Sequence, residues 1–73
     1  MKYIAALKTP VPANAHELVY RIIMDETVCG TYVYLCCSPD TNTASYDEWY
    51  ENTETAMAAW NEQIDERGWI PLN

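Results

Sequence analysis

The chain has 73 residues, of which 49% are hydrophobic, and a net charge of −7. A chain of this length hides only about 60% of its unfolded surface on folding, so we expect one domain over residues 1–73 with a thin core. No apolar run approaches the roughly 20 residues of a membrane helix, and the strong negative charge argues against binding to nucleic acid or anionic lipid.

The first part of the chain is predicted to be mostly strand. Residues 2–7 form a short strand, and Pro10 and Pro12 then break regular structure and set an extended connector. Residues 16–24 are rich in β-branched and aromatic residues, which predicts a second strand. A helix there is the alternative, because the residues just before it resemble a capping box. Residues 25–30, with two acids and a glycine, supply a hairpin connection.

The strand predicted at residues 31–37 has one aliphatic face and one tyrosine face. The aliphatic face is expected to pack against a helix, which leaves Tyr32 and Tyr34 free to contact a partner or a second copy of the chain. The alternative is that these tyrosines lie flat on the sheet and pair with cross-strand neighbours such as Tyr20 or Arg21.

A loop and a third strand follow. Turn-forming residues predict the loop at 38–44, and residues 45–50 then resume an extended pattern. The strand alternates between two sets of side chains that face opposite ways, Tyr46, Glu48 and Tyr50 against Asp47 and Trp49.

The clearest element of the sequence is a helix predicted over residues 53–67. Asn52 or Thr53 can accept a hydrogen bond from a free amide of the first turn, and Gly68 can take the left-handed conformation that ends helices. One face carries apolar side chains at helical spacing, namely Ala56, Met57, Trp60 and Ile64. This face is expected to cover aliphatic side chains of the sheet such as Ile22, Val33 and Leu35.

These elements predict an α+β fold, with a small antiparallel sheet of three or four strands and one C-terminal helix packed on one face, in the order β-β-β-α. After the helix, residues 69–72 give an extended tail that runs back along the helix or lies at a sheet edge. An interior this thin leaves little room for a catalytic cavity.

The negative charge is confined to the second half of the chain. Acids and bases cancel in residues 1–39, whereas residues 40–73 hold eight acids against Arg67 alone. We expect these acids to meet a basic partner or to serve solubility alone. Four of them lack the spacing of an EF-hand loop and are interpreted as a solvated face: Asp40, Asp47, Glu48 and Glu51.

The sequence predicts neither a catalytic nor a metal site. His16 is the single histidine, and nothing places it beside Cys29, Cys36 or Cys37, whose neutral to acidic surroundings discourage a thiolate. Structural zinc sites usually use cysteine pairs spaced as C-x2–4-C, whereas adjacent cysteines on a strand point to opposite faces. We therefore expect free thiols, no enzymatic activity, no cofactor and no metal, with a small zinc-binding or thiol-dependent protein as the alternative.

The segment ETAMAAWNEQ, residues 54–63, resembles the end of the small phage and bacterial restriction-alleviation proteins, in which a zinc-ribbon hairpin precedes a helix with an A-x-x-A-W-N pattern. The matching residues are Ala56, Ala59, Trp60 and Asn61. The first cysteine pair of that family is missing and the second has become adjacent Cys36 and Cys37, so zinc binding does not carry over. The resemblance implies a hairpin plus one helix in a phage or bacterial accessory protein that blunts DNA restriction.

We expect a small cytoplasmic, non-catalytic binding or regulatory protein that acts through contact with another protein. The residues expected to meet the partner are tyrosines and acids of two strands: Tyr32, Tyr34, Tyr46, Asp47, Glu48 and Tyr50. Homodimer formation through the same sheet competes with this contact. The resemblance makes an acidic antagonist of a DNA-acting enzyme the first alternative.

Overall fold

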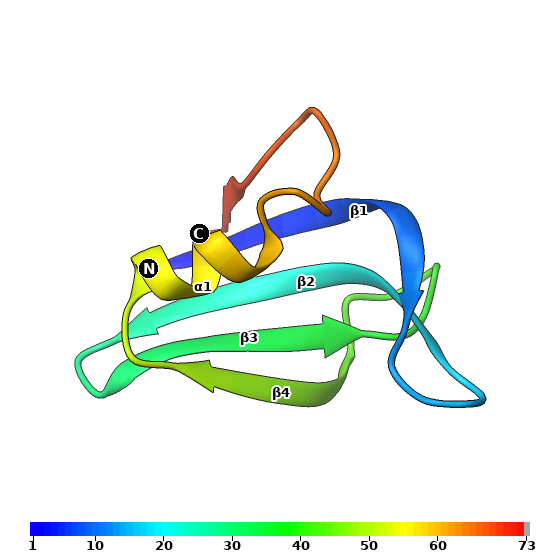
Figure 1. Cartoon of the computed structure of the whole chain (residues 1–73), viewed down its shortest axis with the longest axis horizontal. Coiled ribbons are helices and arrows are strands. Elements are labelled where there is room, and N and C mark those ends of the chain that lie inside the picture. The colour runs from blue at the N-terminus through cyan, green and yellow to red at the C-terminus, as the bar shows by residue number, and fades with distance from the viewer. Residues whose placement is uncertain (73) are drawn as a thin grey trace.

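A computed structural model describes residues 1–72 of the chain, and Asn73 lies outside the described residues. It shows an α+β fold, with one antiparallel sheet of five strands and one short helix on one of its faces (Figure 1). The elements in chain order are β1 (Lys2–Pro12), β2 (Leu18–Thr27), β3 (Gly30–Cys36), β4 (Ala44–Tyr50), α1 (Thr53–Trp60) and β5 (Ile70–Leu72). The strands lie side by side in the order β4-β3-β2-β1-β5.

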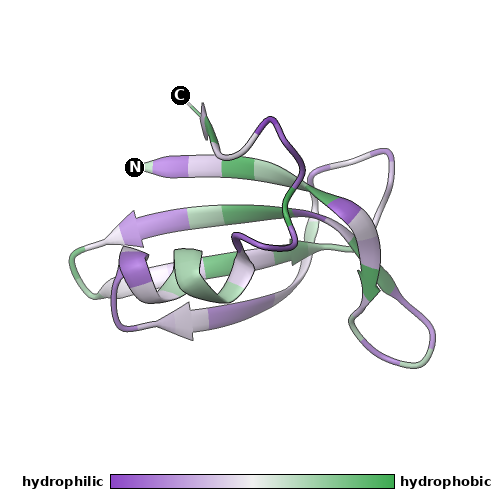
Figure 2. Cartoon of the chain, turned by 45° about the horizontal axis from the view of Figure 1, so that its top comes forward, coloured by the Kyte–Doolittle hydropathy of each residue, from purple (hydrophilic) through white to green (hydrophobic). Residues whose placement is uncertain are grey.

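The α+β class is confirmed, and the predicted number and order of elements is wrong in part. The sheet has five strands rather than three or four, and α1 is not the last element, because β5 follows it and pairs with the start of β1. This pairing places the two ends of the described chain next to each other (Figures 1 and 2). Residues 18–24 belong to β2, so the strand interpretation is confirmed over the helical alternative.

The first strand continues through Pro10 and Pro12, where a break was predicted. On its outer side β1 pairs with β5 and then with the segment after α1, which reaches as far as Lys8. Beyond Lys8 no neighbour in the described chain needs an N–H from that side, so the prolines cost the sheet no hydrogen bond there. The register with β2 does shift between Ala6 and Val11.

The helix ends at Trp60, well before the predicted end at residue 67. Asn52 caps its start as predicted. After Trp60 the chain unwinds, and Ile64 forms a bridge with Leu7 on the outer side of β1. Backbone pairing with β1 therefore replaces the last turns of the predicted helix, while Ile64 stays buried. Gly68, the predicted helix stop, has a left-handed φ of 70° in a later turn.

The core lies between the sheet and the layer formed by α1 and the segment that follows it. α1 packs against β3 and β4, as Figure 2 shows, and the segment that follows it crosses to β1. The buried cluster comprises Ala5, Leu7, Val19, Ile22, Met24, Val33, Leu35, Ala56, Trp60 and Ile64. The predicted cover of the aliphatic sheet face by Trp60 is confirmed, since this residue is only 7% exposed.

Candidate protein-binding surface

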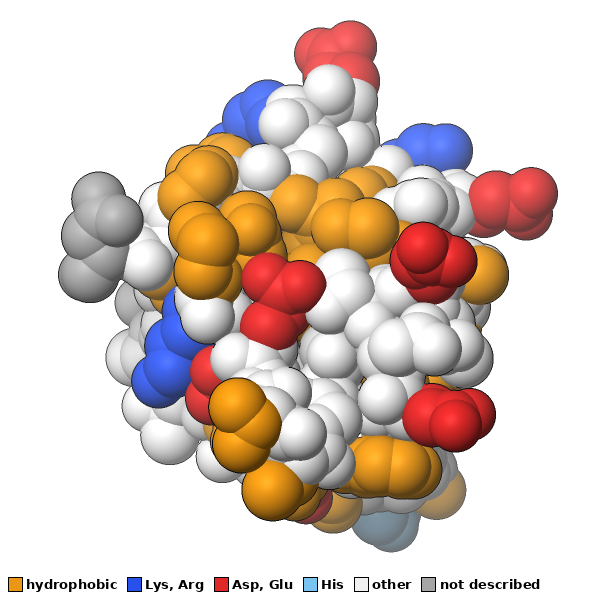
Figure 3. Space-filling model, turned by 90° about the vertical axis from the view of Figure 1, so that its left-hand side faces the viewer, with side chains coloured by type: hydrophobic (Ala, Val, Ile, Leu, Met, Phe, Trp, Pro, Cys, Tyr) orange, Lys and Arg blue, Asp and Glu red, His pale blue; other side chains and the backbone are white. Residues whose placement is uncertain are grey.

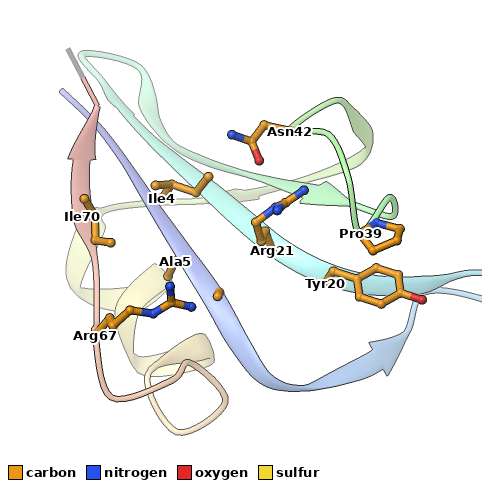
Figure 4. A pocket seen from close by; sticks show the side chains of 9 residues that line it. Ile4, Ala5, Tyr20, Arg21, Pro39, Asn42, Arg67 and Ile70 are labelled. Atoms are coloured by element: carbon orange, nitrogen blue, oxygen red, sulfur yellow. The ribbon is translucent and has the colours of Figure 1, made fainter.

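The sheet face opposite α1 has no second layer over most of its area, and Figure 4 views the molecule from that side. Strand register arranges its side chains in two rows. One row is Leu72, Lys2, Asp25, Tyr32 and Trp49, and the other is Ile70, Ile4, Ile23, Tyr34 and Asp47. None of these ten side chains is buried. We call these ten residues the open face.

Three aromatic side chains gather at the β3–β4 end of the open face. The rings of Tyr32 and Tyr34 stack with their centroids 6.2 Å apart and their planes 16° apart. Trp49 lies directly opposite Tyr32 and is 56% exposed. We call Tyr32, Tyr34 and Trp49 the aromatic cluster. Large aromatic side chains with few rotatable bonds lose little entropy on binding, so this cluster suits a protein interface.

The exposed ring of Trp49 is held in place by the β2–β3 turn. Its Nε1–H donates to the carbonyl oxygen of Cys29 at 3.1 Å. The ring also lies against Gly30, where a Cβ atom would meet the indole nitrogen at 2.3 Å. Gly30 has a φ of 124°, which favours glycine for a second reason. The indole is therefore fixed in position before any partner binds.

Carboxylates flank the aromatic cluster. Asp25 lies opposite Tyr32, and Asp47 lies opposite Tyr34. Burial raises the pKa of Tyr34, and the negative charges of Asp25 and Asp47 raise it further. The two strands that carry the cluster contain no Lys or Arg, because residues 22–66 lack both types, while Lys2 on β1 lies opposite Asp25. The only charges on these two strands are therefore negative, which favours a basic partner surface.

The six residues predicted to contact a partner divide between the two faces of the sheet. Three of them lie on the open face, namely Tyr32, Tyr34 and Asp47, and three lie on the α1 side, namely Tyr46, Glu48 and Tyr50. The predicted alternation of residues 46–50 is thus confirmed. Trp49 was not among the six, although its alternation with Tyr50 already put it on the same face as Asp47.

Glu48 and Tyr50 are engaged by the helix. The Tyr50 hydroxyl donates to Glu48 Oε1 at 2.8 Å, and Trp60 Nε1–H donates to Glu48 Oε1 at 3.3 Å and to the Tyr50 hydroxyl at 3.2 Å. Burial and the bond to Glu48 raise the pKa of Tyr50. A buried indole N–H needs an acceptor, and these two side chains supply it. Both residues therefore help to hold α1 on the sheet.

Tyr46 is engaged by the connection between β1 and β2. Its hydroxyl donates to Glu17 Oε1 and accepts a hydrogen bond from Asn14 Nδ2 at 2.7 Å. The bond to Tyr46 is the main cause of a lowered pKa of Glu17, and the same bond raises the pKa of Tyr46. Tyr46 therefore anchors a loop to β4.

The alternative pairing of the tyrosines with Tyr20 or Arg21 is wrong. In β2, Tyr32 lies opposite Asp25 and Tyr34 lies opposite Ile23, while Arg21 lies opposite Cys36. The tyrosines lie opposite these residues, and not opposite Tyr20 or Arg21, because β2 and β3 meet in a two-residue turn, which fixes the register of the whole hairpin.

Arg21 and Arg67 line a cavity of about 420 Å³ beside the open face, together with Ile4, Tyr20, Pro39 and Ile70 (Figure 4). Both cations already have protein partners. Arg21 Nη2 donates to the carbonyl oxygens of Ser38 and Thr41, at 3.1 and 2.5 Å, and Arg67 forms an ion pair with Asp65. Arg21 therefore anchors the loop after β3, and we assign no ligand to the cavity.

The candidate thiol and metal residues are spread over the sheet. His16 is exposed just before β2, Cys29 is exposed in the turn just after β2, and Cys36 is fully buried. Burial raises the pKa of Cys36, and the opposing effect of Arg21 is smaller. All three cysteines have free thiols. Within residues 1–72 no three His, Cys, Asp or Glu side chains are grouped to hold a metal ion.

Comparisons of this chain with protein-family models, with curated proteins and with solved structures gave no match. In the described part of the chain, α1 is too short and too polar to be a membrane-crossing helix.

Proposed function

We propose that this chain is a small non-catalytic binding protein and that its partner is another protein with a basic surface, contacted through the open face. The observation that supports the proposal most directly is the aromatic cluster beside Asp25 and Asp47, in which Trp49 is 56% exposed and is held in place by a hydrogen bond to Cys29. Exposed Tyr and Trp side chains dominate the binding energy of many protein interfaces. Acids around them select partners by charge.

A capture experiment tests this proposal with variants on the two faces. The tagged full chain is used to capture proteins from its native host, beside Tyr34→Ser and Trp49→Ser variants. Loss of a central aromatic contact costs roughly 2 kcal/mol or more, so each variant should retain a few per cent of the partner. Tyr46→Phe is the matched control, because Tyr46 faces the α1 side, and it should capture as much as the wild type.

The charge part of the proposal is tested on the partner once it is identified and purified. Exposed charges are screened at high ionic strength, so the dissociation constant should rise steeply between low and high salt. A partner that binds with the same affinity at both salt concentrations, or equally well to Tyr34→Ser and Trp49→Ser, would contradict the proposal.

A second candidate function is an acidic antagonist of a DNA-acting enzyme, as the resemblance of residues 54–63 implies. The absence of Lys and Arg from residues 22–66 favours it, because such a surface imitates the negative charge of DNA. In this case duplex DNA should compete with the chain for the captured partner. A partner with no affinity for DNA removes this candidate and leaves the first proposal in place.

The zinc-binding or thiol-dependent alternative has its own measurement. Elemental analysis of the purified protein would detect bound zinc, and titration with a thiol reagent would detect an unusually reactive cysteine. We expect no stoichiometric metal and slow reaction of Cys36, since its side chain is fully buried. Stoichiometric zinc would contradict the proposal of a simple binding protein.

A further inference from the structure

The two edges of the sheet differ in their capacity to accept another strand. β5 has only three residues, and Pro71 in its middle lacks an N–H. β4 has seven residues, Ala44–Tyr50, and contains no proline. Its pairing with β3 is regular from Leu35 to Thr31, with an irregularity only beside Cys36. β4 is therefore the long, regular edge that natural sheets usually cover or interrupt.

The register shows which backbone groups of β4 are free. Thr27 and Gly30 flank a two-residue turn, so they form a hydrogen-bonded pair, and bonded pairs alternate along the hairpin. It follows that Thr31, Val33 and Leu35 direct their backbone groups toward β4 and bond to the residues opposite them, namely Tyr50, Glu48 and Tyr46.

In the regular part of β4 the outward N–H and C=O groups then belong to Asp47 and Trp49. Within residues 1–72 none of these groups bonds to another backbone segment. Since a β-strand added at this edge would satisfy them, the edge is a ready template for main-chain recognition.

From this geometry we propose that β4 accepts an extended basic segment of the partner as a sixth strand of the sheet. The inference rests on the function proposed above and names how the partner binds. Asp47 presents its carboxylate on the open face, and Glu48 presents its own on the α1 side. Both carboxylates are exposed, so an added strand meets a negative charge on each of its faces.

The same acids oppose pairing of β4 with a second copy of the chain. An antiparallel pair of β4 strands can be centred on Asp47 or on Glu48. Each of these two registers places a carboxylate directly opposite its own copy, which destabilises the pair. A Lys or Arg at the facing positions removes the repulsion, and an apolar side chain can pack on Trp49. In the view of Figure 3, Lys and Arg side chains lie at the top and at the left, whereas the lower right shows acidic and hydrophobic side chains with a histidine at the lower edge.

The test uses a synthetic nine-residue peptide of alternating Val and Lys, added to the full chain and followed by amide hydrogen exchange. At saturating peptide, the amides of Asp47 and Trp49 should exchange at least tenfold more slowly. The amides of Tyr46, Glu48 and Tyr50 should change little, because they already bond to β3. Binding without protection of the Asp47 and Trp49 amides, or no binding, would overturn the inference.

Two control peptides separate backbone pairing from charge attraction. The same peptide with Glu in place of Lys should not bind at the same concentration. The Lys peptide methylated on alternate backbone nitrogens keeps its charge but loses its donors on one edge, and its affinity should fall at least tenfold. Equal binding by either control peptide would overturn strand addition by a basic segment.

A variant of the chain supplies the complementary test. Asp47→Pro and Asp47→Ala remove the same charge, but only Asp47→Pro also removes an outward N–H of β4, and proline is tolerated where an edge N–H faces solvent. Asp47→Pro should weaken peptide binding about tenfold relative to Asp47→Ala, while the circular dichroism spectrum stays the same. If Asp47→Pro fails to fold, the methylated peptide still decides the question on the unchanged protein.

The same variants distinguish failure of this inference from failure of the proposed function. If natural partner capture depends on Tyr34 and Trp49 but is the same for Asp47→Pro and Asp47→Ala, the open face binds the partner without strand addition. If capture depends neither on Tyr34 and Trp49 nor on the outward N–H of β4, the proposed function itself is wrong.

Discussion

The two faces of the sheet can be compared along one strand, β4. On the α1 side, Glu48 and Tyr50 accept the indole N–H of Trp60, so their polar atoms serve the fold. On the open face, Asp47 forms no hydrogen bond or ion pair within residues 1–72, and Trp49 is more than half exposed. The same strand thus carries structural residues and candidate binding residues in alternation. The difference shows that residue type alone does not separate the two roles. Trp60 is buried against the sheet, whereas Trp49 stays more than half exposed although its indole N–H bonds to Cys29.

The largest effect is expected from removing Trp60. Trp60→Ala takes away the main side chain with which α1 covers the sheet and removes the indole N–H that donates to Tyr50 and Glu48. Loss of a buried Trp of this kind costs about 3–5 kcal/mol in free energy of unfolding. Urea denaturation followed by far-ultraviolet circular dichroism measures the change. In a domain this small the variant is expected to be largely unfolded at room temperature.

Trp60→Phe and Trp49→Ser refine this comparison of the two faces. Trp60→Phe keeps an apolar ring but loses the two indole hydrogen bonds, so we expect it to cost about 1–2 kcal/mol. Trp49→Ser removes an exposed ring with one hydrogen bond, and about 1 kcal/mol is expected. A cost for Trp49→Ser that equals the cost for Trp60→Ala would mean that the open face, too, is structural.

The next largest effect concerns Gly30. Gly30→Ala places a side chain at a φ of 124° and drives its Cβ into the indole of Trp49. Backbone strain of this kind costs about 1–3 kcal/mol, and the overlap adds to it. In the double variant with Trp49→Ala the overlap disappears and the strain remains, so the two changes should be non-additive by at least about 0.5 kcal/mol. Strict additivity in urea denaturation would contradict the contact between this glycine and the ring.

The smallest effect is a pH dependence at the loop that Tyr46 anchors. The hydrogen bond from Tyr46 lowers the pKa of Glu17 in the folded state. The bond therefore stabilises the fold above the ordinary pKa of Glu17, and its contribution is lost as the pH falls through the lowered value. In Tyr46→Phe the Glu17 pKa should move up toward its ordinary value, which an NMR titration of the side-chain carboxyl measures. An unchanged Glu17 pKa in this variant would contradict the bond.

Local signals in the sequence predicted much of the sheet. Strand alternation identified the two faces of β3 and β4, and the apolar stripe around Trp60 identified the cover of the core. Predictions failed where tertiary pairing competes with local preference. Residues 61–67 have helical character, yet Ile64 gains a bridge to β1 and stays buried, so the helix stops early. Pro10 and Pro12 are compatible with a strand only because the outer side of β1 is free there.

The candidate site was predicted in part for a related reason. Tyr32, Tyr34 and Asp47 lie together on the open face, as a strand pattern can indicate. The engagement of Tyr46 by Glu17 and of Glu48 by Trp60 depends on contacts between residues far apart in the chain. No periodicity within a single strand carries that information. The free edge of β4 likewise depends on the order of the strands in the sheet. The sequence predicted only that there would be three or four strands.

The antiparallel pairing of Lys2 with Leu72 has a practical consequence. Both ends of the described chain lie at the β1–β5 side of the sheet, and β4 lies at the opposite side. An affinity tag or a fused domain attached at either end would therefore emerge away from β4. Immobilising the protein through such an attachment should leave the entire seven-residue strand facing the solution.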